Sequence, residues 1–300
     1  MNKILNQSIL SLFSIQKMLV VSFFIFSFIG CGSAQEPIST LNINKNHIYI
    51  AAHRGGYEND YEDKAPENSI ANIQNAINHG FEIYESDVQR TADGVFVIMH
   101  DPTIDRTTNG SGEVAKMTYN ELKKYHLKYH NGEMSNEKIP LFNEFISKGV
   151  GKIIFKIDYK PELKYLNELL VQIKNLKLQD RVILRFIYKK EIVDALANYN
   201  SDDIPVILFR VKNLAQYEEL KSTFNPKMIS IFERKEFTQE QLKIIDMASK
   251  ENIIIEAHTF GNAKKNREEY WAEQIKLPIT IFHTNKPILF QEFLKKQKLR

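Results

Sequence analysis

The 300-residue sequence contains a single cysteine, Cys31, and little excess charge of either sign. One cysteine excludes an intrachain disulfide framework and a thiolate metal cluster, so any bound metal must be held by oxygen or imidazole ligands. Forty lysines and arginines stand against 37 aspartates and glutamates, for a formal net charge of +3. A balance so close to neutral gives no argument for nucleic acid as a partner.

The chain also lacks a long hydrophobic run, since its clearest apolar stretch, residues 18–29, is too short to predict a membrane span. The first 30 residues carry two basic groups and no acidic one, which is typical of a secretory signal peptide. The sequence Phe-Ile-Gly-Cys at residues 28–31 resembles a bacterial lipobox, in which small residues precede a lipidated cysteine. A plain signal peptide or membrane anchor with a stray cysteine is the alternative.

These features predict a lipoprotein of the bacterial cell envelope, periplasmic or surface-exposed, anchored in the membrane through Cys31. We expect a signal peptide over residues 1–31 and a flexible tether over 32–45, because the latter segment is polar and weakly patterned. Residues 46–300 remain for the folded domain.

From residue 46 onward, short β-rich runs alternate with amphipathic helical segments, the order that builds a parallel sheet covered by helices. An eight-stranded α/β barrel takes up about 250 residues, so we predict one α/β domain, a TIM-type (β/α)8 barrel. Nine strands are expected, at residues 48–52, 81–88, 95–99, 152–158, 181–187, 204–210, 228–232, 252–257 and 279–283. Only a short polar segment with Asp93 and Gly94 separates the second from the third, which predicts a hairpin and places one of the two outside the βα repeat.

Helix signals lie between these strands. Ile70, Ile73 and Ile77 share one helix face, and Gly80 follows as a stop. Capping-box spacing predicts two further helix starts, at Thr118 with Glu121 and at Thr238 with Gln241.

Polar residues directly follow the first predicted strand. The active site of such a barrel forms where the strands end, so residues at the carboxyl ends of strands are the first candidates. His53 can transfer protons, Arg54 is a permanent cation, and Gly55 and Gly56 let the backbone approach a ligand. Taken alone, a histidine at a strand end is more often structural than catalytic.

Glu85 and Asp87 lie two residues apart in the second strand, which puts both carboxylates on one face. Two inward carboxylates are costly unless a cation lies between them, and a hard ion such as Mg²⁺ or Ca²⁺ binds oxygen ligands of this kind. A solvated hairpin stem with both groups in water is the alternative.

Asp158 and Lys160 repeat this spacing at the end of the fourth strand, with Lys156 on the same face. A third carboxylate and a cation aimed inward suit a metal that bridges to a phosphate, with Lys160 and Arg54 neutralising the remaining charge. A purely structural salt bridge is the competing interpretation.

Further histidines follow other strands. His100 comes after the third strand and precedes Asp101, and two imidazoles can divide the work of acid and base near neutral pH. His258 and His283 end late strands, so each is also a candidate to face the site.

Together, these residues resemble the glycerophosphodiester phosphodiesterase family of the PLC-like phosphodiesterase superfamily. The resemblance is dense over residues 50–112, extends through 152–161 and then thins. The matching positions are His53, Arg54 and Gly55, residues 66–69, Glu85 and Asp87, His100 and Asp101, and the Asp-Arg-Thr-Thr-Asn-Gly segment at 105–110.

The resemblance implies a TIM-barrel enzyme that uses a divalent metal, Ca²⁺ or Mg²⁺, to cleave small glycerophosphodiesters to glycerol 3-phosphate and an alcohol. No obligate protein partner is evident. The implied roles are His53 and His100 as acid and base, Glu85, Asp87 and Asp158 as metal ligands, Arg54 and Lys160 as phosphate clamps, and Glu67 as a further carboxylate of the substrate site.

The sequence departs from the family at several positions. The family generally has glutamate where this chain has Asp158, and it often ends its last strand with Thr and Asp, where this chain has Thr284 and Asn285. Its common tryptophan is missing from residues 257–260, and Trp271 lies too far along to replace it. These departures bear on substrate choice more than on reaction type.

Two other hypotheses remain, a phospholipase C/D-like barrel enzyme acting on intact lipid head groups and a non-catalytic lipoprotein that binds phosphodiesters.

Overall fold

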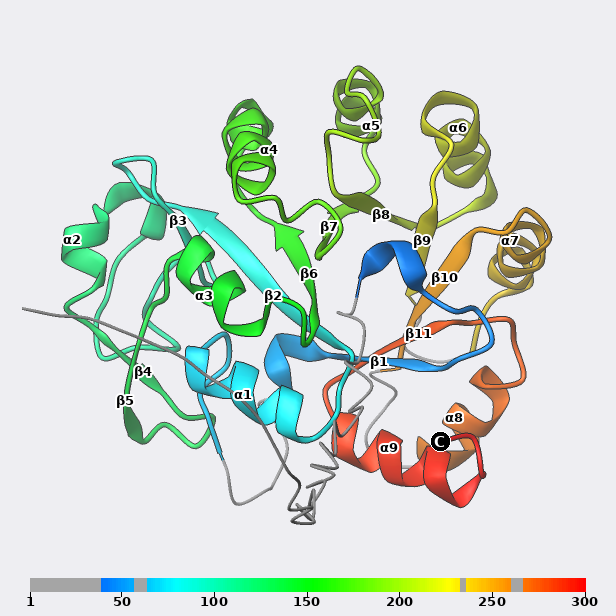
Figure 1. Ribbon diagram of the computed structural model, residues 1–300, viewed down its shortest axis with the longest axis horizontal. Helices are drawn as coiled ribbons and strands as arrows, with labels where there is room; N and C mark the ends of the chain where they lie inside the picture. Colours follow the sequence, from blue (N-terminus) through cyan, green and yellow to red (C-terminus); the bar gives the residue numbers. More distant parts are fainter. Residues whose placement is uncertain (1–38, 57–63, 233–235, 260–266) are drawn as a thin grey trace, which may run out of the picture. The chain divides into compact units, whose positions relative to one another are not determined.

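The computed structural model describes residues 39–56, 64–232, 236–259 and 267–300. Eight parallel strands close into a barrel in the order β1-β11-β10-β9-β8-β7-β6-β2, and β2 pairs back to β1 (Figure 1). The barrel strands are β1 Tyr49–Ala52, β2 Ile83–Arg90, β6 Ile154–Tyr159, β7 Val182–Ile187, β8 Val206–Val211, β9 Met228–Phe232, β10 Ile254–His258 and β11 Ile281–Thr284. The predicted (β/α)8 barrel is confirmed.

The predicted strand at 95–99 is β3 Phe96–Ile98, which pairs antiparallel with β2 and lies outside the barrel. The connection between them carries Gly94 at a φ of 84°, a conformation that glycine adopts at low cost. The predicted hairpin is therefore present, and β3 is the strand that does not belong to the βα repeat.

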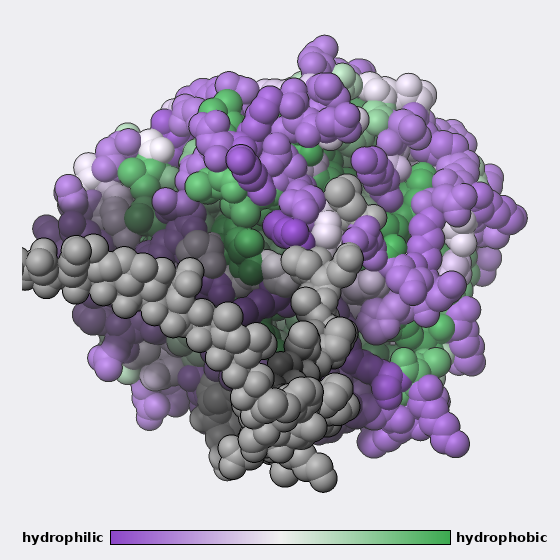
Figure 2. Space-filling model, in the orientation of Figure 1, coloured by the Kyte–Doolittle hydropathy of each residue, from purple (hydrophilic) through white to green (hydrophobic). Residues whose placement is uncertain are grey.

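Helices follow the barrel strands and surround them (Figure 1). Among the described residues they are α1 Ile70–Asn78, α3 Phe142–Gly149, α4 Leu166–Asn175, α5 Lys190–Ala197, α6 Leu214–Phe224, α7 Gln239–Lys250, α8 Arg267–Gln274 and α9 Pro287–Lys296. Gly80 follows α1 at a φ of 72°, and the capping box of Thr238 with Gln241 begins α7 as predicted. The outer rim of this ring is mostly hydrophilic, with hydrophobic residues showing mainly toward the inside (Figure 2).

The segment between β3 and α3 forms a small lobe with its own core. It contains α2 Tyr119–Leu122, which begins at the predicted capping box of Thr118 with Glu121, and a hairpin of β4 His126–Lys128 and β5 Met134–Lys138. Sequence patterning did not predict this hairpin, because β5 reads Met-Ser-Asn-Glu-Lys and buries only Ser135. The apolar core of the small lobe consists of Val97, Met99, Ile104, Val114, Leu122, Leu127 and Ile139.

The barrel interior is layered. Its amino-terminal end is filled by one apolar cluster, Ala51, Ile83, Ile154, Ile183, Val206, Leu208, Met228 and Ile281. Inward positions recur every second residue along a strand, so the next layers are set by the residues two and four positions later. In β2 these are Glu85 and Asp87, and in β6 they are Lys156 and Asp158. The apolar layer supports the barrel, and the polar layers above it form the floor of the candidate site.

The chain before β1 contacts the barrel. A turn of 3-10 helix spans Thr40–Asn42, and the Thr40 backbone N–H donates to the Asp180 carbonyl at 2.8 Å, just before β7. Ile43 packs against the apolar layer at the amino-terminal end. Part of the segment predicted as a tether is thus packed on the barrel, whereas the predicted signal peptide and Cys31 lie outside the described residues. Among the described helices, none is long and apolar enough to cross a membrane.

Candidate active site

His53 begins a tight turn directly after β1. Arg54, Gly55 and Gly56 all have positive φ, at 47°, 80° and 77°. A Cβ atom on Gly55 would collide with the Tyr84 side chain, so only glycine permits this approach. The turn carries His53 to the carboxyl end of the barrel, where its Nδ1 lies 2.5 Å from the Asn285 Oδ1 and its Nε2 lies 3.9 Å from the Glu85 Oε2.

Burial lowers the pKa of His53 to about 4, against the opposing effect of the Glu85 carboxylate. The imidazole is therefore neutral at physiological pH. Since the Asn285 Oδ1 can only accept, the proton of the neutral ring is on Nδ1 and the lone pair is on Nε2, directed to the barrel interior.

The three predicted metal ligands are brought together. Asp87 on β2 stands in register with Asp158 on β6, and with Glu85 they place one carboxylate oxygen each within 4.8 Å of the other two. All three are buried. Burial, and next the adjacent Glu85 carboxylate, raise the pKa of Asp87 to about 6. A divalent cation would relieve this crowding of negative charge, and oxygen ligands at this spacing fit Mg²⁺ or Ca²⁺.

Two cations lie against these carboxylates. The Lys160 Nζ is 2.6 Å from the Asp158 Oδ2 and 3.1 Å from the Asp87 Oδ1. Arg185 on β7 donates to the same Asp158 oxygen at 2.6 Å. Lys160 was predicted at this site, but Arg185 was not. A lone charged residue inside the apolar strand Val-Ile-Leu-Arg-Phe-Ile is the signal that indicates it.

His100 follows β3 at the edge of the same site. Its Nδ1 lies 2.5 Å from the Asp101 Oδ1, and the other oxygen of that carboxylate accepts from the Arg106 Nε at 2.6 Å. Although burial raises it, the pKa of Asp101 falls to about 2 because Arg106 and His100 stabilise the carboxylate. His100 is thus held by a charged partner, whereas His53 is held by a neutral amide.

The Glu67 carboxylate accepts hydrogen bonds from two arginines. Arg106 donates to both Glu67 oxygens at 2.8 Å in a fork, and the Arg54 Nη1 donates at 3.2 Å. These arginines outweigh burial and keep the pKa of Glu67 low. The Arg54 backbone N–H also donates to the Glu85 Oε2 at 3.1 Å. Glu67 therefore positions cations at the site, and its predicted contact with substrate stays a prediction.

The late strands contribute two histidines, which the sequence indicated as candidates, and one glutamate, which it did not. His283 on β11 faces the site, with its Nε2 3.5 Å from the Glu85 Oε2 and its ring centre 5.0 Å from that of His53. His258 on β10 lies beside His283. Glu256, which the sequence reading missed, pairs with the fully buried Lys156 at 2.5 Å. Trp271 lies away from these groups, packed on Phe290 of α9.

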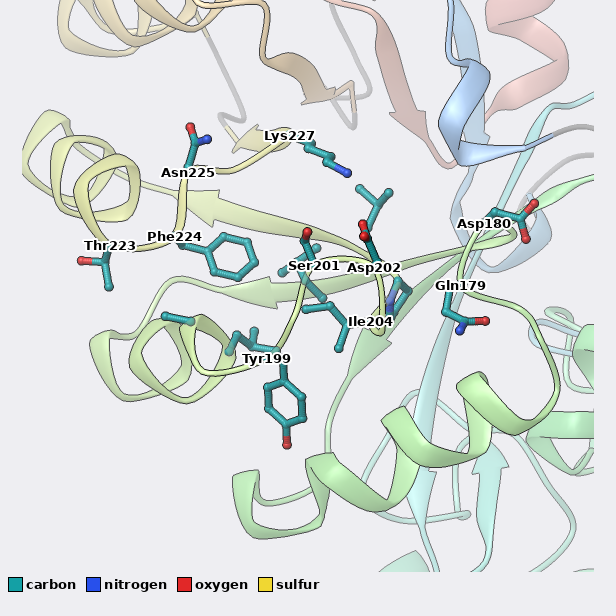
Figure 3. Close-up of a pocket in the computed structure, with 15 residues that line it drawn as sticks. Gln179, Asp180, Tyr199, Ser201, Asp202, Ile204, Thr223, Phe224, Asn225 and Lys227 are labelled. Carbon is teal, nitrogen blue, oxygen red and sulfur yellow. The ribbon is translucent and has the colours of Figure 1, made fainter.

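A cavity of about 430 Å³ lies elsewhere, at the amino-terminal ends of β8 and β9 (Figure 3). The charged residues that line it are Asp180, Asp202 and Lys227. It contains none of the predicted site residues.

The fold and the site define a TIM barrel with clustered carboxylates and histidines at its carboxyl-terminal face. The family model for the glycerophosphoryl diester phosphodiesterase family matches residues 53–289. The chain belongs to this family.

Curated relatives match part of the chain. Glycerophosphodiester phosphodiesterase 1 of Bos taurus is 36% identical over 107 residues, which span 35% of this chain and 31% of that protein. Glycerophosphodiester phosphodiesterase of Caldanaerobacter subterraneus is 36% identical over 141 residues, 45% of this chain and 56% of that protein. The match thus spans about a third to a half of these relatives.

Solved structures match most of the fold. A glycerophosphoryl diester phosphodiesterase from Parabacteroides distasonis superposes with a TM-score of 0.74 at 24% identity, covering 85% of this chain and 88% of that one. A phosphodiesterase of Oleispira antarctica in complex with the product sn-glycerol-3-phosphate gives a TM-score of 0.65 at 21% identity, covering 82% and 96%. At these identities the likeness shows the shared barrel.

Proposed function

We propose that this protein is a metal-dependent phosphodiesterase that hydrolyses glycerophosphodiesters to glycerol 3-phosphate and an alcohol. Family membership supports the reaction class. The observation that carries the proposal is the cluster of three buried carboxylates, Glu85, Asp87 and Asp158, with His53 and His100 on the same face of the barrel.

Glu85, Asp87 and Asp158 would hold the metal, and a hard divalent ion there supplies charge to stabilise the phosphodiester as negative charge develops. Lys160 and Arg54 lie beside these carboxylates, which places two permanent cations where phosphate oxygens would bind.

The partners of the two histidines support different roles. His53 is neutral with its lone pair on Nε2, so it suits the base that removes a proton from the attacking hydroxyl. The Nδ1 of His100 is held by the Asp101 carboxylate, which fixes the orientation of the ring and leaves Nε2 for the leaving alcohol, so His100 suits the acid. In this proposal the nucleophile is the substrate's own glycerol hydroxyl, and water then opens the resulting cyclic phosphate.

The test is a substrate panel of glycerophosphocholine, glycerophosphoethanolamine, intact phosphatidylcholine and sphingomyelin, each with and without a chelator. We expect metal-dependent release of glycerol 3-phosphate from the deacylated diesters. Turnover of the intact lipids alone would instead identify a phospholipase, an alternative kept open by Asp158 in place of the family's glutamate. No hydrolysis of any substrate with either ion would refute catalysis.

We also propose that Cys31 carries a lipid that anchors the protein in the bacterial envelope, a proposal supported by the apolar stretch and the Phe-Ile-Gly-Cys sequence. The test is metabolic labelling with a radioactive fatty acid. Wild-type protein should take up the label and fractionate with membranes, whereas Cys31→Ser should do neither. An unlabelled wild-type protein would refute the anchor.

A further inference from the structure

Two histidines and a glutamate of the late strands form a group apart from the three clustered carboxylates. Glu256 and His258 lie two residues apart on β10, and His258 stands in register with His283 on β11. The three side chains therefore share the inner face of two adjacent strands. All are at least 96% buried.

The donor atoms of this group are spaced like the ligands of a transition metal. The His258 Nε2 lies 3.2 Å from the Glu256 Oε1 and 3.3 Å from the His283 Nδ1, and all three donors lie within 4.8 Å of one another. Ligands at about 2.0–2.1 Å from a tetrahedral ion stand roughly 3.3 Å apart. We propose that Glu256, His258 and His283 form a second metal site, distinct from the carboxylate cluster, for an imidazole-preferring divalent ion such as Zn²⁺.

Neighbouring groups are placed to orient these ligands. The Glu256 Oε1 also accepts from the Ser230 Oγ at 2.9 Å, and its other oxygen pairs with the Lys156 Nζ. The ring nitrogen of His283 on the opposite side, Nε2, faces the Glu85 Oε2 at 3.5 Å. A carboxylate that receives the far N–H of a metal-bound histidine fixes its tautomer and its orientation. Through Glu85, the second site touches the carboxylate cluster.

A competing group shares one of these ligands. His53, Glu85 and His283 also bring three donor atoms together. The Glu85 Oε2 is 3.5 Å from the His283 Nε2 and 3.9 Å from the His53 Nε2, which is wider than the spacing around His258. A zinc ion at that place would also occupy the nitrogen of His53 assigned to proton transfer. The shorter separations favour the Glu256 group.

The experiment measures zinc binding rather than turnover, so its outcome is independent of the proposed phosphodiesterase activity. The full chain is stripped with a chelator and supplied with excess Mg²⁺ to occupy the carboxylate cluster. Zn²⁺ is then titrated in competition with a chromogenic chelator. We expect one zinc ion per chain, and a loss of affinity of about a hundredfold or more in His258→Gln, since outer-shell changes alone cost 10- to 100-fold.

Two controls sharpen the result. His130→Gln replaces an exposed histidine of the small lobe between β3 and α3 and should bind zinc like the wild type. His53→Gln should also retain it, because His53 belongs only to the competing group. Unchanged affinity in His258→Gln, or a loss in His53→Gln alone, would overturn the proposal.

A second measurement needs no variant and so does not depend on how His258→Gln folds. X-ray absorption of the wild type loaded with one equivalent of Zn²⁺ counts the imidazoles bound to the metal. Two imidazoles with Zn–N distances of about 2.0–2.1 Å are expected. A shell of oxygen ligands without imidazole would refute the site.

Discussion

In the first half of the barrel, from β1 to β6, the inward side chains above the apolar layer are mostly carboxylates paired with arginine and lysine. In the second half, from β7 to β11, Glu256 and two imidazoles, His258 and His283, occupy the corresponding face together with Arg185. The family motifs noted in the sequence lie mostly in the first half, over residues 50–112 and 152–161. The two halves meet where Glu85 faces His283, where Arg185 on β7 pairs with Asp158, and where Lys156 pairs with Glu256.

This difference separates the proposed reaction centre from the strands that complete the wall around it. The groups proposed to carry catalysis come from β1, β2, β3 and β6, on consecutive segments of chain. The late strands complete the wall of the site and support His53 through Asn285. We therefore expect changes in the first half to reduce turnover most, and changes in the second half to act on stability, metal content and orientation.

The largest expected effect is on the two proposed proton-transfer groups. His53→Ala and His100→Ala should each lower kcat by about 10²- to 10⁴-fold, the usual contribution of general acid or base catalysis. The measurement is release of glycerol 3-phosphate at saturating substrate, with His130→Ala as the control. Near-normal turnover in either variant would remove that histidine from the mechanism.

Loss of one proposed metal ligand comes next. Asp158→Asn keeps the shape of the side chain but removes its charge, and we expect kcat to fall by about 10²- to 10³-fold. Added Ca²⁺ or Mg²⁺ should restore part of the activity by mass action. If Asp158 serves only to pair Lys160 and Arg185, the variant and the wild type should instead need the same concentration of metal for half-maximal activity.

The buried pair of Lys156 on β6 with Glu256 on β10 joins the two halves, and breaking it should act mainly on stability. Lys156→Met leaves the Glu256 carboxylate buried without its cation, which costs about 3–5 kcal/mol in the free energy of unfolding. Denaturant unfolding measures this loss, and the double variant Lys156→Met with Glu256→Gln should recover much of it. Equal stability of the single variant and the wild type would contradict the importance of the pair.

Substitution of Arg106 tests the hydrogen bonds that connect Glu67 with Asp101 in the first half, neither of which is a proposed metal ligand. Arg106→Ala removes charged hydrogen bonds to Glu67 and Asp101, and we expect kcat/KM to fall by about 10- to 150-fold. Arg106→Lys should recover little, because lysine cannot reproduce the fork on Glu67. Full activity in the lysine variant would show that only the positive charge matters.

The smallest expected effect is at Asn285, the contact between the last strand and His53. Asn285→Ala removes one hydrogen bond and should lower kcat about two- to tenfold, with KM unchanged. Asn285→Asp keeps the acceptor oxygen and should recover orientation. A change confined to KM would place Asn285 in substrate binding instead.

Much of the secondary structure and of the candidate site could be predicted from local sequence patterns. All nine expected strands are present, and hydrophobic alternation placed Glu85, Asp87 and Asp158 on the inner faces because side chains in a strand alternate strictly. The hairpin of β4 and β5 was not predicted, since its strands are short and polar and pair across a separate core. Periodicity carries no signal for such a segment.

The sequence by itself determined the eight-stranded alternation, the candidate ligands and the two histidines, because each depends on neighbours a few residues away. Only the tertiary structure decided their partners. Asn285 meets His53 across 232 positions of sequence, and Lys156 meets Glu256 across 100, because closing the barrel brings β11 beside β1 and places β10 across from β6. Which polar groups share one buried interior is set by strand order and register, and these are fixed only when the sheet closes.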